Sequence, residues 1–210
     1  MKKFIAIAGN IGVGKTTLTK KLSEHFGWKA FFEPVAENPY LKDFYEDMKT
    51  WAFHSQMFFL GKRLEDHYKL IQEQGSVIQD RSLYEDAEIF ARNLYRAGHI
   101  SERDWQVYKQ VYKTCVKLLP APDLVIYVKA SVDKIMERIR KRGRDFEDKM
   151  PQAYIEDLNK LYDEWMANFQ TAQVLTINYD NVDLKHNEED FSNFVEGVKS
   201  YMGYRSTDLY

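Results

Sequence analysis

Apolar residues gather in short runs that are separated by longer stretches with helical periodicity. The runs are apolar at consecutive positions, as in strands of a parallel sheet that is covered on both faces. This alternation of strands and helices predicts an α/β domain with right-handed crossovers. We expect strands at residues 4–8, 30–32, 77–79, 124–128 and 174–177.

The longer stretches predict helices, because apolar side chains recur in them every three or four positions. We expect helices at residues 15–27, 39–47, 50–74, 84–97, 101–118, 131–143, 151–169 and 188–202. Ser101 and Ser131 are expected helix caps, and Pro120 and Pro122 end the helix before them. The chain has no internal repeat and no Gly/Ser linker, so we expect residues 1–210 to form a single domain.

The predicted helix at 50–74 carries apolar side chains at spacings of three and four, which would form one buried stripe. They are Phe53, Met57, Leu60, Leu64, Tyr68 and Ile71. Gln56 and Arg63 are seven residues apart, which puts both at the edge of this stripe. Polar groups beside an apolar face are costly to bury unless they are paired, so both side chains need a polar partner.

The overall charge of the chain argues against a general nucleic-acid binder. The 210 residues include 30 Lys and Arg against 32 Asp and Glu, a formal charge of −2, whereas nucleic-acid binders usually have a basic excess. No apolar run approaches the roughly 20 residues of a membrane span. A single cysteine, Cys115, excludes an intramolecular disulfide. We expect a cytoplasmic protein that binds neither nucleic acid nor membrane.

Residues 9–16, with the sequence GNIGVGKT, match the phosphate-binding pattern G-x-x-x-x-G-K-[ST] between a predicted strand and a predicted helix. The glycines let successive N–H groups face one anion, and the helix adds its positive N-terminal end. Lys15 would place a charge on the transferred phosphate, and the Thr16 hydroxyl can ligate Mg²⁺. The motif predicts a nucleoside triphosphate ligand. Its expected contacts are Gly9, Asn10, Ile11, Gly12, Val13, Gly14, Lys15, Thr16 and Thr17.

Other nucleotide-binding classes fit less well. A GTPase needs Asn-Lys-x-Asp to read guanine, and the nearest run, NKLY at residues 159–162, lacks the final Asp. A motor or remodelling ATPase is usually larger. The sequence therefore favours a small phosphoryl-transfer enzyme that acts on a metabolite.

Charged residues follow two further predicted strands. Glu33 comes after the second strand, where a carboxylate can face the phosphate loop and accept a proton from an attacking hydroxyl. Asp80 and Arg81 end the third strand, where an acidic group can hold Mg²⁺ and an arginine can stabilise the moving phosphoryl group. The alternatives are a solvated loop carboxylate and a structural Asp–Arg pair.

A run of cations ends the predicted helix at 131–143. Residues 138–144, with the sequence RIRKRGR, contain five basic side chains, and Arg138 and Arg142 share one helical face. Such a run is tolerated opposite phosphates or in solvent. We expect residues of about 138–150 to form a lid over the triphosphate, the alternative being a solvated basic face.

Together these motifs resemble the deoxynucleoside kinase family. The matching elements follow in order along the first 150 residues: Gly9–Thr16, Glu33-Pro34-Val35, Trp51 through Arg63, Asp80-Arg81-Ser82 followed by Tyr84 and Asp86, Phe90, and Arg138–Glu147. The resemblance implies the P-loop NTPase fold, with three α/β/α layers, a five-stranded parallel sheet and a helical lid. It also implies ATP-dependent phosphorylation of a deoxynucleoside 5′-hydroxyl for nucleotide salvage.

The resemblance implies roles near the reacting groups. Glu33 matches the general base that takes the proton of the 5′-hydroxyl, and Arg81 would position that hydroxyl and stabilise the transferring phosphate. Asp80 matches an acidic position associated with Mg²⁺. Tyr45 and Glu147 match the pair that holds the 3′-hydroxyl.

Further implied roles concern the base of the substrate. Gln56 matches the side chain whose amide pairs with the base, which suits an adenine edge, and Phe90 would stack on it. Arg63 and Asp86 match positions that are smaller or apolar in thymidine-preferring relatives. Here both are charged and could bind the far edge of the base, as in the branch that takes deoxycytidine, deoxyguanosine or deoxyadenosine. We favour deoxyadenosine; a purely structural Arg63–Asp86 ion pair is the alternative.

On the donor side, Arg138, Arg142 and Arg144 would surround the ATP phosphates, and Tyr179 and Asp180 would contact the ATP base. The resemblance also implies a homodimer and feedback inhibition by a deoxynucleoside triphosphate. Two other functions stay open: a nucleoside monophosphate kinase such as a thymidylate kinase, and a nucleotide-binding switch without chemistry. The first ranks lower, because a carboxylate in apolar company would repel a substrate phosphate.

Overall fold

A computed structural model describes residues 2–33, 37–144, 147 and 150–203. Five parallel strands form one sheet in the order β2-β3-β1-β4-β5. The predicted strands are confirmed, with bounds that differ by about one residue. They are β1 (Phe4–Gly9), β2 (Lys29–Phe31), β3 (Val77–Asp80), β4 (Leu124–Lys129) and β5 (Gln173–Asn178).

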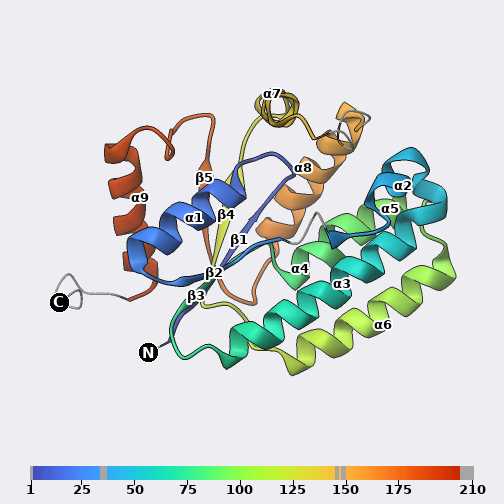
Figure 1. Ribbon diagram of the computed structural model, residues 1–210, viewed down its shortest axis with the longest axis horizontal. Helices are drawn as coiled ribbons and strands as arrows, with labels where there is room; N and C mark the ends of the chain where they lie inside the picture. Colours follow the sequence, from blue (N-terminus) through green and yellow to red (C-terminus); the bar gives the residue numbers. More distant parts are fainter. Residues whose placement is uncertain (1, 34–36, 145–146, 148–149, 204–210) are drawn as a thin grey trace.

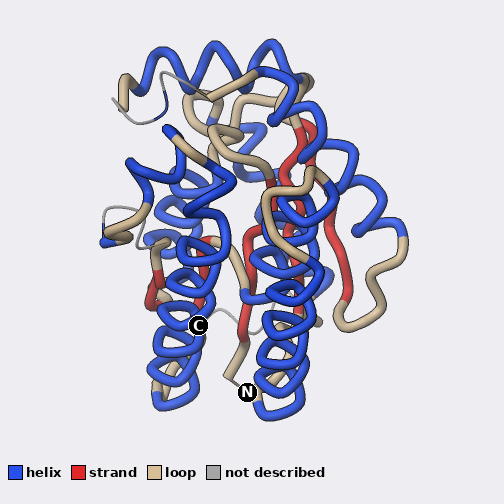
Figure 2. Tube along the Cα trace, turned by 90° about the vertical axis from the view of Figure 1, so that its right-hand side faces the viewer, coloured by secondary structure: helices blue, strands red, loops and turns tan. Residues whose placement is uncertain are grey.

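Helices cover both faces of the sheet and make three layers, as expected (Figure 1). One face packs on α1 (Lys15–Phe26) and α9 (Glu188–Tyr201), and the other on α3 (Met48–Gln72) and α8 (Gln152–Ala167). The remaining α-helices are α2 (Leu41–Glu46), α4 (Leu83–Glu85), α5 (Arg92–Arg96), α6 (Glu102–Leu118) and α7 (Val132–Arg142). Figure 2 shows the strands enclosed between helices. Within the described part of the chain, no helix combines the length and the hydropathy needed to cross a bilayer.

Alternating side chains explain how the sheet is buried on both faces. Ile5 and Ile7 of β1 join the core beneath α1 and α9, whereas Phe4 and Ala6 join the core beneath α3 and α8. Each of the four is less than a tenth exposed. Successive residues of a strand point to opposite faces, so a strand that is covered on both sides must be apolar throughout.

The expected helix at 84–97 is confirmed, but its middle has π-helical hydrogen bonds. The structure divides it into α4, a π-helical segment η2 (Asp86–Ala91) and α5. A π turn closes hydrogen bonds over five residues instead of four and often marks functional sites. Asp86 and Phe90, which were both expected to bind substrate, lie in this segment.

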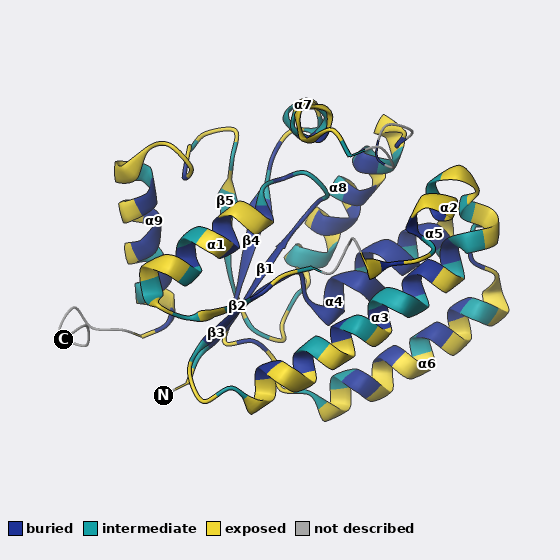
Figure 3. Ribbon diagram, viewed as in Figure 1, coloured by how far each residue is buried: buried dark blue, intermediate teal, exposed yellow. Residues whose placement is uncertain are grey.

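The expected burial of α3 is wrong along its second half. Leu64, Tyr68 and Ile71 are exposed, Tyr68 by 64%, although the apolar stripe predicted that they would be buried. Gln56 and Arg63 are buried instead. Figure 3 shows buried and exposed positions alternating along α3. Arg63 is buried because the carboxylates of Glu33 and Asp86, from other elements, pair with it in the interior.

The bounds of the predicted helices differ from the observed ones by up to two residues. Of the two predicted caps, Ser101 is confirmed and Ser131 is not. The Ser101 hydroxyl accepts a hydrogen bond from the Asp104 backbone N–H at the start of α6, and α6 ends before Pro120. Ser131 precedes α7, but its side chain makes no capping bond to the helix. Asp180 accepts from both the Ser131 N–H, at 2.9 Å, and its hydroxyl, so that carboxylate holds this helix end.

Candidate active site

A cavity of about 740 Å³ opens at the carboxyl ends of the strands, beneath α7 and beside α3. Parallel strands bring their carboxyl ends to one edge of a sheet, so residues that are distant in sequence meet there. Most of the expected site residues line this cavity: Ile11, Gly12, Gly14, Lys15, Thr16, Thr17, Glu33, Tyr45, Gln56, Asp80, Arg81, Asp86, Phe90, Arg138, Arg142, Arg144, Glu147 and Tyr179. Outside its lining lie Gly9, Asn10, Val13, Arg63 and Asp180.

The conformation of the phosphate loop depends on its glycines and on contacts with α8. Gly12 and Gly14 adopt positive φ angles of 75° and 112°, which side chains rarely tolerate. The Asn10 amide donates to the Ile155 carbonyl at 3.0 Å and to Asn159 Oδ1 at 2.6 Å, which fastens the loop to α8. Asn10, which does not line the cavity, therefore anchors the loop.

Lys15 lies at the closed end of the cavity. Its Nζ donates to the Asn10 carbonyl at 2.9 Å, and the side chain is buried. Burial, with the positive charge of Arg81, lowers the pKa of Lys15 to about 8. Beside it, the Thr16 hydroxyl donates to Asp80 Oδ2 at 2.5 Å. The two groups that were expected to hold Mg²⁺ are therefore neighbours.

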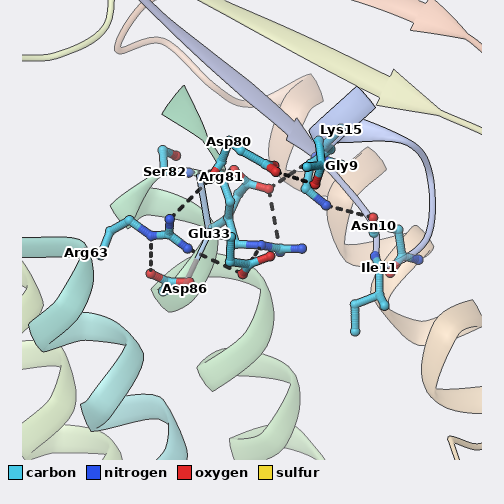
Figure 4. A network of polar contacts seen from close by, with 12 residues as sticks. Gly9, Asn10, Ile11, Lys15, Glu33, Arg63, Asp80, Arg81, Ser82 and Asp86 are labelled. Atoms are coloured by element: carbon cyan, nitrogen blue, oxygen red, sulfur yellow. Dashed lines mark hydrogen bonds and ion pairs between the residues drawn. The ribbon is translucent and has the colours of Figure 1, made fainter. Parts of the chain in front are cut away.

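Glu33 lies between two arginines at the end of β2 (Figure 4). Its Oε1 is 2.7 Å from Arg81 Nε, a close ion pair without hydrogen-bond alignment, and it accepts from Arg63 Nη2 at 3.4 Å. Burial opposes ionisation, but the charges of Arg81 and Arg63 outweigh it and hold the pKa of Glu33 below its ordinary value. A solvated loop carboxylate does not describe this group. Pro34 and Val35, which belong to the same motif, lie outside the described residues.

Asp80 is a buried carboxylate that lines the cavity. Burial raises its pKa, although Lys15 pulls the other way. While Oδ2 accepts from Thr16, Oδ1 is buried and has no hydrogen-bond donor among the described residues. A buried carboxylate oxygen without a donor is suited to a cation.

Arg63 and Asp86 form a buried ion pair at the wall of the cavity. Arg63 Nε donates to Asp86 Oδ2 at 3.1 Å, and its Nη1 donates to the Asp80 carbonyl at 3.2 Å. Its third nitrogen faces Glu33, so the whole guanidinium is engaged by protein oxygens. Burial raises the pKa of Asp86, and Arg63 opposes this. Asp86 reaches the cavity directly, whereas Arg63 supports it from behind.

Two neutral side chains, Gln56 of α3 and Phe90 of the π segment, also line the cavity. Gln56 is buried, and its Oε1 has no hydrogen-bond partner in the described part of the chain. Its amide thus has an acceptor available to a ligand. The Phe90 ring lines the cavity from the π segment, with the Arg81 guanidinium carbon 4.2 Å from the ring centroid. Arg81 occupies one face of this ring.

Two arginines at the C-terminal end of α7, Arg142 within the helix and Arg144 just after it, pair with Glu147. Arg142 donates to both carboxylate oxygens of Glu147, at 2.6 and 2.7 Å from Nη2, and Arg144 donates at 3.4 Å. Tyr45 lies close enough for the negative charge of Glu147 to add to burial in raising its pKa. Residues 145–146 and 148–149 of the expected lid lie outside the described residues.

Arg138 and Tyr179 close the donor end. Arg138 Nη1 donates to the Val13 carbonyl at 2.6 Å, and its guanidinium lies 5.4 Å from the centre of the Tyr179 ring. Asp180 was expected beside them at the ATP base. Its carboxylate instead binds the start of α7, outside the cavity lining.

Comparison with known proteins identifies the family. The profile described as Deoxynucleoside kinase matches residues 5–202. The chain belongs to the deoxynucleoside kinase family. A deoxyadenosine/deoxycytidine kinase from Bacillus subtilis is 36% identical over 198 residues, which cover 93% of this chain and 91% of the relative. A deoxyguanosine kinase from the same organism is 39% identical over 204 residues, with 93% and 96% covered.

Solved structures agree with this assignment. The deoxyadenosine kinase from M. mycoides with bound dCTP superimposes with a TM-score of 0.82 at 30% identity, and covers 94% of this chain and 99% of that chain. The same kinase with bound dATP gives 0.81 at 32% identity, with 92% and 99% covered. These findings confirm the resemblance and the fold inferred from the sequence. Members of the family are kinases that use a nucleotide phosphate donor, so this deoxynucleoside kinase is an enzyme.

Several residues at the site were missed by the sequence analysis. Tyr154 of α8 lines the cavity, and Glu85 and Tyr162 form a buried pair behind Arg81. One signal was present for Glu85, because Ser82 precedes it by three positions, and Ser-x-x-Glu is typical of a capping box. Tyr162 had no such signal, since aromatic residues on a helix are ordinary core residues.

The lowered pKa of Lys15 predicts how the affinity of this deoxynucleoside kinase for a nucleoside triphosphate depends on pH. Phosphate binding favours the charged ammonium, so binding requires proton uptake once pH exceeds the value of about 8 in the free protein. We expect the affinity to decrease as the pH passes about 8, and to fall by up to about tenfold per pH unit at higher pH. Titration calorimetry in buffers up to pH 9.5 measures this. Lys15→Arg, which stays charged throughout, is the control and should flatten the profile; an equally steep profile in both proteins would contradict the prediction.

Proposed function

We propose that this enzyme transfers the γ-phosphoryl group of ATP to the 5′-hydroxyl of a deoxynucleoside, with deoxyadenosine among its substrates and nucleotide salvage as its role. The observation that carries the proposal is one cavity that joins the phosphate loop to Glu33 and to the Gln56 amide. A triphosphate, an alcohol and a base can thus lie along one path. Names of relatives, which include deoxyadenosine kinases, support this substrate class.

In the proposed reaction the 5′-oxygen forms a bond to the γ-phosphorus while the bond from that phosphorus to the ADP oxygen breaks. Glu33 receives the hydroxyl proton. A carboxylate with a lowered pKa is a weak base, so it takes the proton late, once bonding to phosphorus has made the hydroxyl acidic. Most of the rate enhancement then comes from positioning and from charge stabilisation by Lys15 and Arg81.

Thr16 and Asp80 are the groups proposed to hold Mg²⁺. Support comes from their adjacent oxygens and from the buried Asp80 Oδ1, which has no donor among the described residues. Mg²⁺ usually binds through one or two protein groups together with substrate phosphates. It supplies neutralisation of charge on the phosphates.

The nucleoside is proposed to lie between α3 and the π segment. Gln56 can both accept and donate, and so can pair with an adenine edge, with Phe90 beside the base and Asp86 at its far edge. Tyr45 and Glu147 are proposed for the 3′-hydroxyl. Because Glu147 is also bound by Arg142, sugar binding and the position of the lid arginines would be linked.

The donor triphosphate is proposed to lie in the phosphate loop beneath Arg138, Arg142 and Arg144, with the ATP base toward Tyr179. Support comes from their common position in the cavity lining. Asp180 is left out of this proposal, since its carboxylate binds α7.

We further propose a homodimer that uses α3 and α6. Tyr68 of α3 and Leu118 of α6 are 64% and 76% exposed, with Leu64, Ile71 and Val107 also open to solvent. Apolar side chains that are exposed together on one face of a helix are typical of a surface that is covered by another protein chain. Light scattering measures the mass, and a monomer at micromolar concentration would contradict a stable dimer.

Feedback inhibition by a deoxynucleoside triphosphate is also proposed. A triphosphate could place its phosphates in the loop and its base against Gln56, in the space of the acceptor. Related kinase structures with bound dCTP and dATP support the chemistry. Inhibition by dATP that is competitive with both substrates tests it, and inhibition independent of the deoxynucleoside concentration would contradict it.

A panel of acceptors tests the proposed function. With ATP and Mg²⁺, we expect phosphorylation of deoxyadenosine and much slower phosphorylation of thymidine, whose methyl group would meet the charged Asp86 side of the pocket. Deoxyguanosine, deoxycytidine and the ribonucleosides complete the panel. Deoxyadenosine monophosphate is the matched control and should not react, because Glu33 would repel its phosphate. Turnover of the monophosphate alone would favour the alternative kinase class, and no turnover of any deoxynucleoside would end the proposal.

The role of Glu33 is tested with Glu33→Gln. We expect kcat to fall by roughly 10²-fold or more while deoxynucleoside affinity changes little, because a general base acts in the transition state. Glu37→Gln is the control, since that carboxylate is exposed and pairs with Lys62 at 2.9 Å. Single-turnover rates and equilibrium binding measure both properties. An unchanged rate in Glu33→Gln would remove Glu33 as the base.

A further inference from the structure

Glu85 is a fully buried carboxylate that the proposed reaction does not use. Its Oε2 accepts from the Ser82 backbone N–H at 2.9 Å, which is the reciprocal bond of the capping box at the start of α4. One oxygen suffices for such a cap, and caps usually lie at the surface. The second oxygen, Oε1, accepts from the Gly9 N–H at 3.1 Å and from the Tyr162 hydroxyl at 2.8 Å. Glu85 therefore joins the first residue of the phosphate loop to α8.

Tyr162 connects this carboxylate to Arg81. Its hydroxyl accepts from Arg81 Nη1 at 2.9 Å and donates to Glu85. The direction is fixed because a guanidinium can only donate and an ionised carboxylate can only accept. The Tyr162 ring is fully buried and stacks on Tyr127, with ring centroids 5.8 Å apart and an angle of 15°. A rigid ring thus holds the hydroxyl against Arg81.

Arg81 needs such support. Its φ angle of 67° makes it the sole residue other than glycine with a positive φ in the described part of the chain, and such a conformation is strained for a long side chain. Its other polar partner is Glu33, at 2.7 Å. In the proposed reaction Glu33 takes up a proton and loses its charge, which weakens its hold on Arg81. Glu85, 3.8 Å from Arg81 Nη1, takes no proton in the proposed step.

We propose that Glu85 and Tyr162 are positioning residues for phosphoryl transfer, which hold Arg81 in register with the phosphate loop while Glu33 accepts the proton. The inference rests on the proposed function. The pair touches no substrate and acts through Arg81. It links the acceptor side of the site, through Arg81, to the donor side, through Gly9.

Tyr162→Phe tests the inference, because it removes one hydroxyl and leaves the stacked ring. We expect kcat for deoxynucleoside phosphorylation to fall about tenfold, with the KM values for ATP and deoxynucleoside within about twofold of the starting protein. Tyr127→Phe is the matched control. It removes a hydroxyl from the adjacent stacked ring whose partner is Asp163, and it should leave kcat unchanged. A Tyr162→Phe protein with unchanged kcat would overturn the inference.

A double-mutant cycle separates positioning from a general structural role. If Tyr162 acts through Arg81, then Tyr162→Phe should cost nothing further in an Arg81→Lys protein, whose shorter side chain loses the fork that meets the hydroxyl. The same tenfold loss in that background would overturn the inference. Glu85→Gln should also lower kcat. If the Glu85→Gln protein does not fold, the double-mutant cycle of Tyr162 and Arg81 tests the inference without it. Absence of any activity in the starting protein would instead refute the proposed function.

Discussion

Burial of several charges at one edge of a parallel sheet is the constraint on which the rest of this structure depends. Lys15, Arg63 and Arg81 lie among the carboxylates of Glu33, Asp80, Glu85 and Asp86, and nearly all of these side chains are enclosed. An unpaired charge would be prohibitive there, so each cation is met by carboxylates or carbonyls. The compensation holds the reacting groups in place without a ligand, which is the preorganisation that phosphoryl transfer requires.

The pairing of buried charges also explains why the second half of α3 buries Arg63 and exposes the apolar residues beside it. Packing Leu64 and Tyr68 inward would have left the Arg63 guanidinium in solvent and Asp86 buried without a cation. Burying Arg63 satisfies Asp86, the Asp80 carbonyl and Glu33 together. The apolar residues that are left outside then form the surface proposed for a second copy. The orientation of α3 about its axis thus has two results: the charge of Arg63 is paired at the site, and apolar side chains are exposed on the opposite face of the helix.

The π segment Asp86–Ala91 forms part of the cavity wall. Asp86 and Phe90, four positions apart, share one face of this segment, and both line the cavity. Glu85, just before it, faces the opposite way toward Tyr162 and Gly9. One short stretch of chain thus contributes to the cavity wall and to the support of Arg81.

The sequence by itself determined the strands, most helices and the phosphate loop, because each depends on neighbouring residues in the chain. It also determined the family, because several such local motifs follow one another in a specific order. Apolar runs report burial on both faces of a sheet, and Gly9–Thr16 carries its chemistry in consecutive positions. Tertiary structure alone decided which face of α3 is buried, that Asp180 binds α7 rather than the cavity, and that Tyr162 lies against Arg81, 81 residues earlier. Those outcomes depend on which distant charges meet in low dielectric, and no local pattern of residues encodes that meeting.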